Sequence, residues 1–186
     1  MAFIPGILIA LFTFPGVIMH EFGHKVLCDI MGVKVRKVVY FRLTLDKAPG
    51  YVIHDDVKNF SQAFFIVVGP LIAGTLSALL MFYVNILLPF LIEGILSEYV
   101  SIFSAWLGFC FGMHAFPSSG DAKALWAMSW GRLKEWNVFA LMGFPVAIII
   151  WLADKLRILW IDFFYAIGLY LVAMYSLEWF LITLFG

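Results

Sequence analysis

The sequence predicts a mainly α-helical protein that crosses a membrane about five times and has a small β-sheet at one membrane face. Of its 186 residues, 64% are hydrophobic and only 13% are charged. Soluble domains contain about 45–50% apolar and about 25% charged residues, so this composition indicates an integral membrane protein. The apolar residues gather into stretches that suit membrane-spanning helices, which need about 20 residues each. These stretches are residues 3–30, 60–90, 95–116, 136–153 and 158–185.

The first and last of these stretches carry features that place their ends. Pro15-Gly16 divides the first stretch. Because proline suits the first turn of a helix, we expect a short entry piece followed by a helix that begins near Pro15. The fourth and fifth stretches are separated only by "DKLR", residues 154–157, which we expect to form a short turn. A chain of this length is expected to form a single domain, residues 1–186.

Residues 33–56 differ in composition from the apolar stretches. They are rich in β-branched and aromatic residues, partly alternate in polarity, and contain Pro49-Gly50. This pattern predicts two or three short strands with a turn near Pro49-Gly50. We expect strands near residues 35–45 and 51–53, which would form a small sheet between the first and second membrane helices.

Positive charge is distributed unevenly and predicts an orientation. Seven of the twelve Lys and Arg residues lie between positions 25 and 58, and three more lie between 123 and 134. The connection after the second apolar stretch contains Glu93 and Glu98 and no base. By the positive-inside rule, this multi-pass protein of the cell membrane would have its N-terminus outside and its C-terminus in the cytoplasm. Lys155 and Arg157 would then lie on the outer side. No basic arm or tract suggests a nucleic acid partner.

The segment "MHEFGH", residues 19–24, places three ionisable side chains at the end of an apolar stretch. Each would cost at least about 2.5–3.5 kcal/mol at the centre of a bilayer, so a partner must offset that cost. On a helix, His20 and His24 lie on one face about 6 Å apart along the axis, and can bind one metal ion. Glu21 points about 100° away from His20, towards a water molecule rather than the metal. Such an H-E-x-x-H motif is typical of a site where zinc lowers the pKa of water towards about 7 and the glutamate is the general base.

A catalytic zinc ion usually has three protein ligands, so a third must come from another segment. We expect Asp121, because it follows the cytoplasmic end of the third stretch after a Pro-Ser-Ser-Gly turn and reaches the depth of the two histidines. Asp121 could instead, or in addition, cap the helix that follows it. Cys28, on the same helix as the two histidines, and His114 are the alternatives for the third ligand. His54, in the sheet region, is expected to be solvated.

Three segments together resemble the site-2 protease family of intramembrane zinc metalloproteases. "VIMHEFGH" looks like the active-site helix of that family, and "FFIVVGPLIAGTLSALL" is similar to its Gly-Pro segment, with Gly69-Pro70 at the matching place. "AFPSSGDA" is similar to the turn before the third ligand of the family, although Gly120-Asp121-Ala122 stands where the family has Leu-Asp-Gly. The resemblance spans residues 14–130, and residues 131–186 would form two further transmembrane helices. The chain looks like a divergent, minimal member.

The resemblance implies that His20, His24 and Asp121 bind one Zn2+ ion and that Glu21 is the catalytic base. It implies a zinc metalloendopeptidase that hydrolyses peptide bonds of transmembrane or membrane-associated proteins near the cytoplasmic side of the lipid bilayer. The substrate peptide would have to be extended, and the edge of a predicted strand could pair with it. The alternative is a membrane scaffold or chaperone of the same fold without catalysis, although a scaffold has no need for Glu21.

Overall fold

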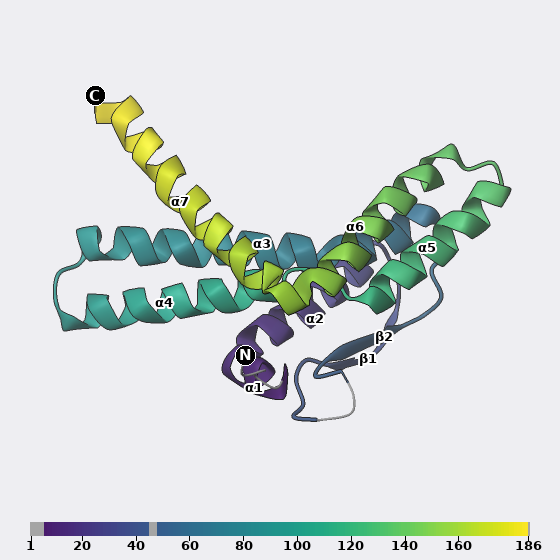
Figure 1. Cartoon of the computed structure of the whole chain (residues 1–186), viewed down its shortest axis with the longest axis horizontal. Helices are drawn as coiled ribbons and strands as arrows, with labels where there is room; N and C mark the ends of the chain where they lie inside the picture. Colours follow the sequence, from purple (N-terminus) through teal and green to yellow (C-terminus); the bar gives the residue numbers. More distant parts are fainter. Residues whose placement is uncertain (1–5, 45–47, 186) are drawn as a thin grey trace.

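A computed structural model describes residues 6–44 and 48–185 of the chain, and this part is mainly helical (Figure 1). The α-helices are α1 (Gly6–Phe12), α2 (Phe14–Ile30), α3 (Phe60–Leu91), α4 (Ile95–Met113), α5 (Ser119–Lys134), α6 (Gly143–Leu156) and α7 (Ile161–Phe185). The short 3-10 helices are η1 (Val138–Met142) and η2 (Arg157–Leu159). The strands are β1 (Val35–Val39) and β2 (Tyr51–His54).

Four helical stretches of the described chain are long and apolar enough to cross a membrane. They are Phe60–Leu91, Ile95–Met113, Val138–Leu159 and Ile161–Leu184. Continuous helix suits such stretches, because a backbone surrounded by lipid must satisfy its own hydrogen bonds. The structure therefore confirms the prediction of a mainly helical fold with apolar helices of membrane-spanning length.

The first apolar stretch does not form one long helix. α1 ends at Phe12 and α2 begins at Phe14, so Pro15 lies in the first turn of α2, where its missing N–H is not needed. α2 has 17 residues, which at 1.5 Å per residue is about 26 Å, less than the ~30 Å of a hydrocarbon core. The predicted break near Pro15-Gly16 is present, whereas a fifth membrane span is not confirmed. Residues 3–5 of the stretch lie outside the described residues.

The predicted sheet forms between α2 and α3 in chain order. β1 and β2 pair antiparallel, with Val39 opposite Tyr51 and Val35 opposite His54. The connection between them contains Pro49-Gly50, where a turn is predicted, and its residues 45–47 lie outside the described residues. β1 ends at Val39, so it is shorter than the predicted strand 35–45, and the described part of the chain has no third strand.

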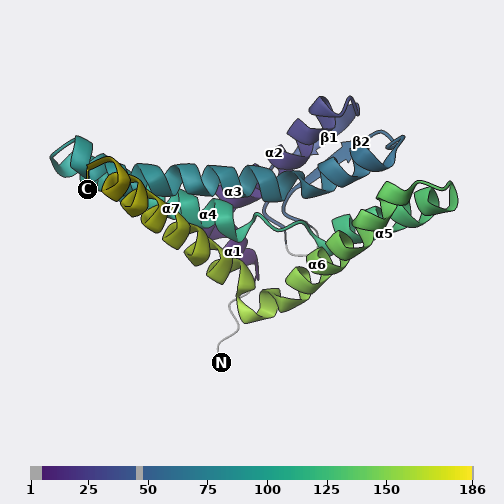
Figure 2. The same ribbon diagram turned by 90° about the horizontal axis from the view of Figure 1, so that it is seen from above.

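α3 is the longest helix, and its two halves pack on different helices (Figures 1 and 2). A cluster of buried side chains joins its N-terminal half to α5, η1 and α6: Phe60, Val67, Ala122, Leu125, Ala140, Ala147 and Ile150. Another buried cluster joins its C-terminal half to α7: Ala78, Phe82, Leu169 and Ala173. α2 crosses α3 between these clusters, at Gly69. The centre of the molecule is therefore the place where α2 meets both halves.

α5 and α6 form a hairpin that projects from this centre, away from α4 and α7 (Figure 2). α6 ends at Leu156, and the chain then passes through η2 and Trp160, whose φ angle is 61°. The predicted "DKLR" turn is therefore misplaced. Residues 154–156 form the last turn of α6, and the chain changes direction at residues 157–160.

α7 begins at the centre and runs towards the end of the molecule where α3 and α4 are connected (Figures 1 and 2). A simple alternation of spans predicts the C-terminus on the opposite side from that connection. α6 packs mainly on α5 and makes few contacts with α7. The predicted cytoplasmic C-terminus has no support in this arrangement.

Candidate metal centre

α2 presents His20 and His24 to one cavity. The residues are one helical turn apart, so their side chains leave the helix on the same face. Their ring centroids are 5.1 Å apart and the rings meet edge to face. The helix repeat therefore places the two imidazoles next to each other on one face of α2.

Each imidazole is held by a backbone carbonyl of another segment, the C-cap of α4 or the helix α3. His20 Nδ1 lies 2.8 Å from the carbonyl oxygen of His114, and His24 Nδ1 lies 2.8 Å from that of Ile66. A carbonyl oxygen only accepts, so each Nδ1 must carry the proton and donate it. This leaves the Nε2 lone pair of each ring for a metal ion. Metal-ligating histidines are oriented in this way by the partner of their other ring nitrogen.

A close backbone approach brings α3 to His24. A Cβ atom on Gly23 would lie 2.8 Å from the carbonyl oxygen of Gly69, and a Cβ atom on Gly69 would lie 2.7 Å from that of Gly23. Only two glycines allow the helices to touch at this distance. Ile66 precedes Gly69 by one turn, so the contact places the Ile66 carbonyl beside His24. Pro70, next to Gly69, is fully buried at the crossing.

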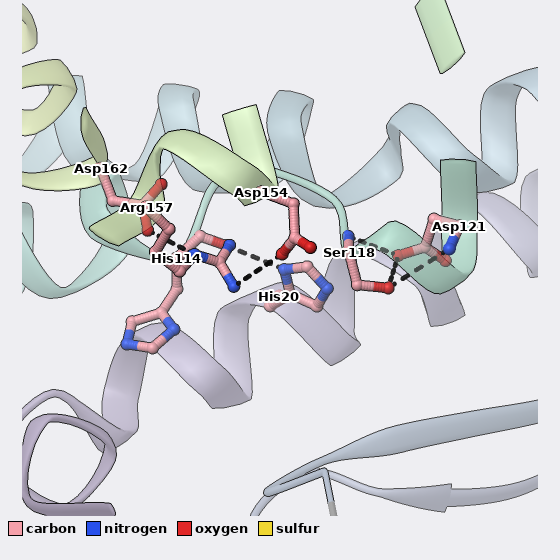
Figure 3. A network of polar contacts seen from close by, with 7 residues as sticks. All are labelled: His20, His114, Ser118, Asp121, Asp154, Arg157 and Asp162. Atoms are coloured by element: carbon pink, nitrogen blue, oxygen red, sulfur yellow. Dashed lines mark hydrogen bonds and ion pairs between the residues drawn. The ribbon is translucent and has the colours of Figure 1, made fainter. Parts of the chain in front are cut away.

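Asp121 reaches the histidines from the start of α5 and also caps that helix. Its Oδ2 accepts hydrogen bonds from the Ser118 backbone N–H at 2.8 Å and from the Ser118 hydroxyl at 2.6 Å (Figure 3). Ser118 is the N-cap, and Asp121 completes a capping box. The other oxygen, Oδ1, lies 3.5 Å from His24 Nε2. Of the two roles predicted for Asp121, helix capping is present, with Asp121 as the third residue of the capping box and Ser118 as the N-cap. The second oxygen faces the candidate ligand His24.

The three side chains form a candidate donor set for one cation. One ligand atom from each of His20, His24 and Asp121 lies within 4.8 Å of the other two. Burial raises the pKa of Asp121. When the His24 ring is protonated on both nitrogens, its contact with Asp121, together with the two Ser118 hydrogen bonds, outweighs burial and lowers the pKa of Asp121 to about 2. Asp121 is therefore a carboxylate at neutral pH. Two imidazoles and one carboxylate form a set that suits zinc and leaves a coordination position for water.

Glu21 lies beside this group and is only 7% exposed. It lines the same cavity of about 400 Å³ as the three candidate ligands, together with Gly50 and Tyr51 of the β-hairpin. A Cβ atom on Gly50 would lie 2.6 Å from Glu21 Cγ. The hairpin backbone therefore passes directly over the Glu21 side chain, on the cavity side of α2.

The alternative third ligands are placed elsewhere. Cys28 is fully buried among apolar side chains between α2 and α3 and is not part of the group of candidate ligands. His114 contributes its carbonyl to His20, while its Nε2 lies 2.7 Å from the Thr13 hydroxyl. Figure 3 shows the His114 ring turned away from His20. Among the described residues, Asp121 is therefore the third member of the group.

Two further charged or titratable side chains, which were not predicted to belong to the site, line the cavity. His54, predicted to be solvated, lines the cavity, and its Nδ1 donates to the Asp55 carbonyl at 2.7 Å. The sequence has no signal for the position of His54 at the cavity, because this position depends on the pairing of β2 with β1. Arg157, predicted to lie on the outer side, lines the same cavity as His20.

Arg157 is fixed between two carboxylates (Figure 3). Its Nε donates to Asp162 Oδ2 at 2.6 Å, and its Nη1 lies 3.4 Å from Asp154 Oδ1. The sequence predictions placed Arg157 on the opposite side of the membrane from His20, whereas both line one cavity because α6 returns to the centre of the molecule. A sequence signal did exist for the pairing: Asp162 lies inside the fifth apolar stretch, where a charged residue generally needs a partner, and Asp154 and Arg157 are charged residues just before that stretch.

Comparison with known proteins assigns no family to this chain. No family model, curated protein or solved structure matches it. The likeness to site-2 proteases therefore rests on the sequence motifs alone. Any inference about the chemistry of the site rests on the geometry described above.

Proposed function

We propose that the protein is an intramembrane zinc metalloprotease of the site-2 protease type. One observation supports this most strongly. His20, His24 and Asp121 come from two separate segments, yet their ligand atoms lie within 4.8 Å of one another. Glu21 lines the same cavity. Two imidazoles, one carboxylate and an adjacent glutamate match the residue types that zinc peptidases use.

The residues around the cavity would have distinct roles in peptide hydrolysis. A bound zinc ion would supply Lewis acidity and a water molecule of lowered pKa. Glu21 would accept the proton of that water and pass it to the leaving amine. The carbonyls of His114 and Ile66 would keep the imidazoles in the correct tautomer. Ser118 would orient Asp121 through its two hydrogen bonds.

The proposed substrate is a transmembrane or membrane-associated protein with a locally extended segment. A helical peptide shields its carbonyls in its own hydrogen bonds, so the cleaved segment must be unwound. Tyr51, Val52 and His54 of β2 line the cavity. An extended peptide that paired with the edge of β2 would pass close to the candidate ligands.

The proposal includes an orientation in the cell membrane. Basic residues are concentrated in the β-hairpin region and in α5, on the arm of the molecule away from the α3–α4 connection (Figure 2). The positive-inside rule favours the cytoplasm for this arm. Cleavage would then take place near the cytoplasmic side of the bilayer.

The test combines metal content and proteolysis on the full-length protein purified in detergent. The wild type, Glu21→Gln and Glu98→Gln are compared with a panel of single-span substrates. Glu98 is an exposed carboxylate at the start of α4, so its variant controls for loss of a negative charge. We expect about one zinc ion per chain in all three proteins, with cleavage by the wild type and Glu98→Gln but not by Glu21→Gln.

Two results would contradict the proposal. Zinc in all proteins without cleavage by any of them would favour the scaffold or chaperone of the same fold. Cleavage that survives in Glu21→Gln would show that Glu21 is not the base, or that a contaminating protease is responsible.

A further inference from the structure

A groove of about 290 Å³ lies between α5 and α6, separate from the metal-binding cavity. Its lining residues are Ala122, Lys123, Trp126, Ala147, Ile148 and Trp151, none of which lines the first cavity. Ala122 and Ala147 are almost fully buried where the two helices pack. Their small side chains leave space above the helix contact, so the groove exists because alanines stand where larger residues would fill it.

Two tryptophans flank this space without being covered. Trp126 is 45% exposed and Trp151 is 46% exposed. Indole rings bury large apolar area when a partner is present, and they are common where an apolar environment meets a polar one. Half-exposed indoles on both sides of an apolar groove indicate an occupant with an apolar chain.

Positive charge lies at one end of the groove. Lys123 lines it from the first turns of α5, and the Lys155 ammonium nitrogen, in the last turn of α6, lies 5.9 Å from the centroid of the Trp151 ring. Because the helices are antiparallel, the start of α5 and the end of α6 are neighbours. Within the described chain, neither lysine belongs to an ion pair.

The groove opens to the region that lipid would occupy. α6 belongs to the apolar stretch Val138–Leu159, which is long enough to cross a membrane. Its outward residues Ile148, Ile149 and Leu152 are exposed, as lipid-facing residues are. An occupant that enters from the bilayer must match both the apolar lining of the groove and the positive charge of Lys123 and Lys155 at one end of it.

We propose that this groove binds one anionic phospholipid. The acyl chain lies between Trp126 and Trp151, and the phosphate is held by Lys123 and Lys155. An amphiphile with a negative head group satisfies both features, whereas a free anion leaves the apolar walls uncovered and a zwitterionic lipid leaves the two ammonium charges without a net opposite charge. The inference does not depend on the proposed protease activity.

The test is a lipid titration of the intact protein in detergent, followed by native mass spectrometry. The probes are phosphatidylglycerol and phosphatidylcholine with identical acyl chains, and inorganic phosphate. We expect one saturable phosphatidylglycerol per chain, bound at least about fivefold more tightly than phosphatidylcholine. Inorganic phosphate alone should not compete with the lipid. Each lysine contributes an attraction to anionic lipid, so the double variant Lys123→Gln/Lys155→Gln should lose about 10- to 30-fold in affinity.

The chain offers matched controls for both features of the groove. Lys134 lies 5.7 Å from the centroid of the Trp130 ring, in the same kind of pair but outside the groove. Lys134→Gln should change phosphatidylglycerol affinity less than twofold, and Trp126→Ala should weaken it more than Trp130→Ala does. Thermal unfolding of each variant shows whether the fold is retained.

The proposal is overturned if phosphatidylcholine binds as tightly as phosphatidylglycerol, or if phosphate alone competes. It is also overturned if Lys134→Gln costs as much as Lys123→Gln, because binding would then follow overall charge rather than this groove. A membrane-spanning peptide that binds the groove in place of lipid would assign the site to a protein partner and equally refute it.

Discussion

The two elements that supply the candidate metal ligands differ in how they hold them. α2 carries both histidines one turn apart, and each ring is fixed by a carbonyl of a packed helix, His114 or Ile66. α5 carries Asp121 at its first turn, and the same carboxylate caps the helix through Ser118. The rings of the candidate histidine ligands are therefore oriented by contacts between segments that pack together. The carboxylate of Asp121 is oriented by hydrogen bonds within its own turn.

This difference has a consequence for how each half of the site can fail. Moving α3 relative to α2 would remove the Ile66 carbonyl from His24. Moving α5 would carry Asp121 away while leaving its capping bonds intact. The α2 half should therefore be sensitive to the contact between Gly23 and Gly69, and the α5 half to the chemistry of one carboxylate.

The largest expected effect is on zinc binding by His24→Ala. This change removes one of three ligands and leaves the Ile66 carbonyl without its donor. Loss of an outer partner alone usually costs about 10–100-fold in metal affinity, so loss of a ligand should cost more than about 100-fold. Zinc titration with a competing chelator measures this. His54→Ala is the control, because His54 lines the cavity but is not in the ligand group. Unchanged zinc affinity in His24→Ala would refute the site.

Asp121→Asn should have the next largest effect. The amide keeps nearly the same shape and still offers an acceptor to Ser118, but it loses the negative charge that faces His24. We expect zinc affinity to fall about 10- to 100-fold, with little change in the stability of α5. The same titration on Asp56→Asn, an exposed carboxylate outside the group, should give the wild-type value. If Asp121→Asn binds zinc normally, the third ligand is another residue.

Gly23→Ala tests whether the close packing of α2 on α3 supports the two histidines. The added Cβ would meet the backbone of Gly69 and Pro70 at 2.8 Å, and backbone atoms of a helix cannot move aside individually. Overpacking of this kind usually costs about 1–3 kcal/mol, and the separation of α2 from α3 should also weaken zinc binding. Unfolding in denaturant together with zinc titration measures both effects.

Gly131→Ala is the matched control for that substitution. Gly131 is in the interior of α5, and a Cβ there would have no neighbour within 4 Å. Because alanine favours helix over glycine, this change should stabilise the protein by up to about 1 kcal/mol and leave zinc affinity unaltered. Equal losses in Gly23→Ala and Gly131→Ala would mean that the contact between α2 and α3 does not support the histidines.

The sequence predicts the α2 half of the site better than the α5 half for a physical reason. The spacing of His20 and His24 becomes a distance as soon as the segment is helical, because the helix repeat is fixed. The position of Asp121 depends on where α5 packs, which hydropathy does not record. A capping role and a ligand role also favour the same residue types at the same place, so the sequence alone left both open.

The same reasoning explains which parts of the fold could be predicted. The lengths of the apolar stretches predicted the long helices, and the β-branched and aromatic composition of residues 33–56 predicted the hairpin. Partners could not be predicted, because Ala147 and Ile150 of α6 would look the same whether they packed on α5 or on α7. That one choice of partner brings Arg157 to the cavity.

Ser118→Ala should have the smallest effect and separates the two roles of Asp121. The substitution removes the hydroxyl that donates to Oδ2 and accepts from the Asp121 N–H, whereas the backbone N–H of residue 118 still donates to Oδ2. Loss of an N-cap side chain costs about 1 kcal/mol, so unfolding in denaturant should shift by about that amount. Zinc affinity should fall only a few-fold, because Oδ1 remains directed at His24. Ser119 is one residue further on and is not the N-cap, so Ser119→Ala should change neither the stability nor the zinc affinity. If Ser118→Ala instead weakens zinc binding as much as Asp121→Asn does, the cap itself holds the ligand in place, and the α5 half depends on local geometry as strictly as the α2 half depends on helix packing.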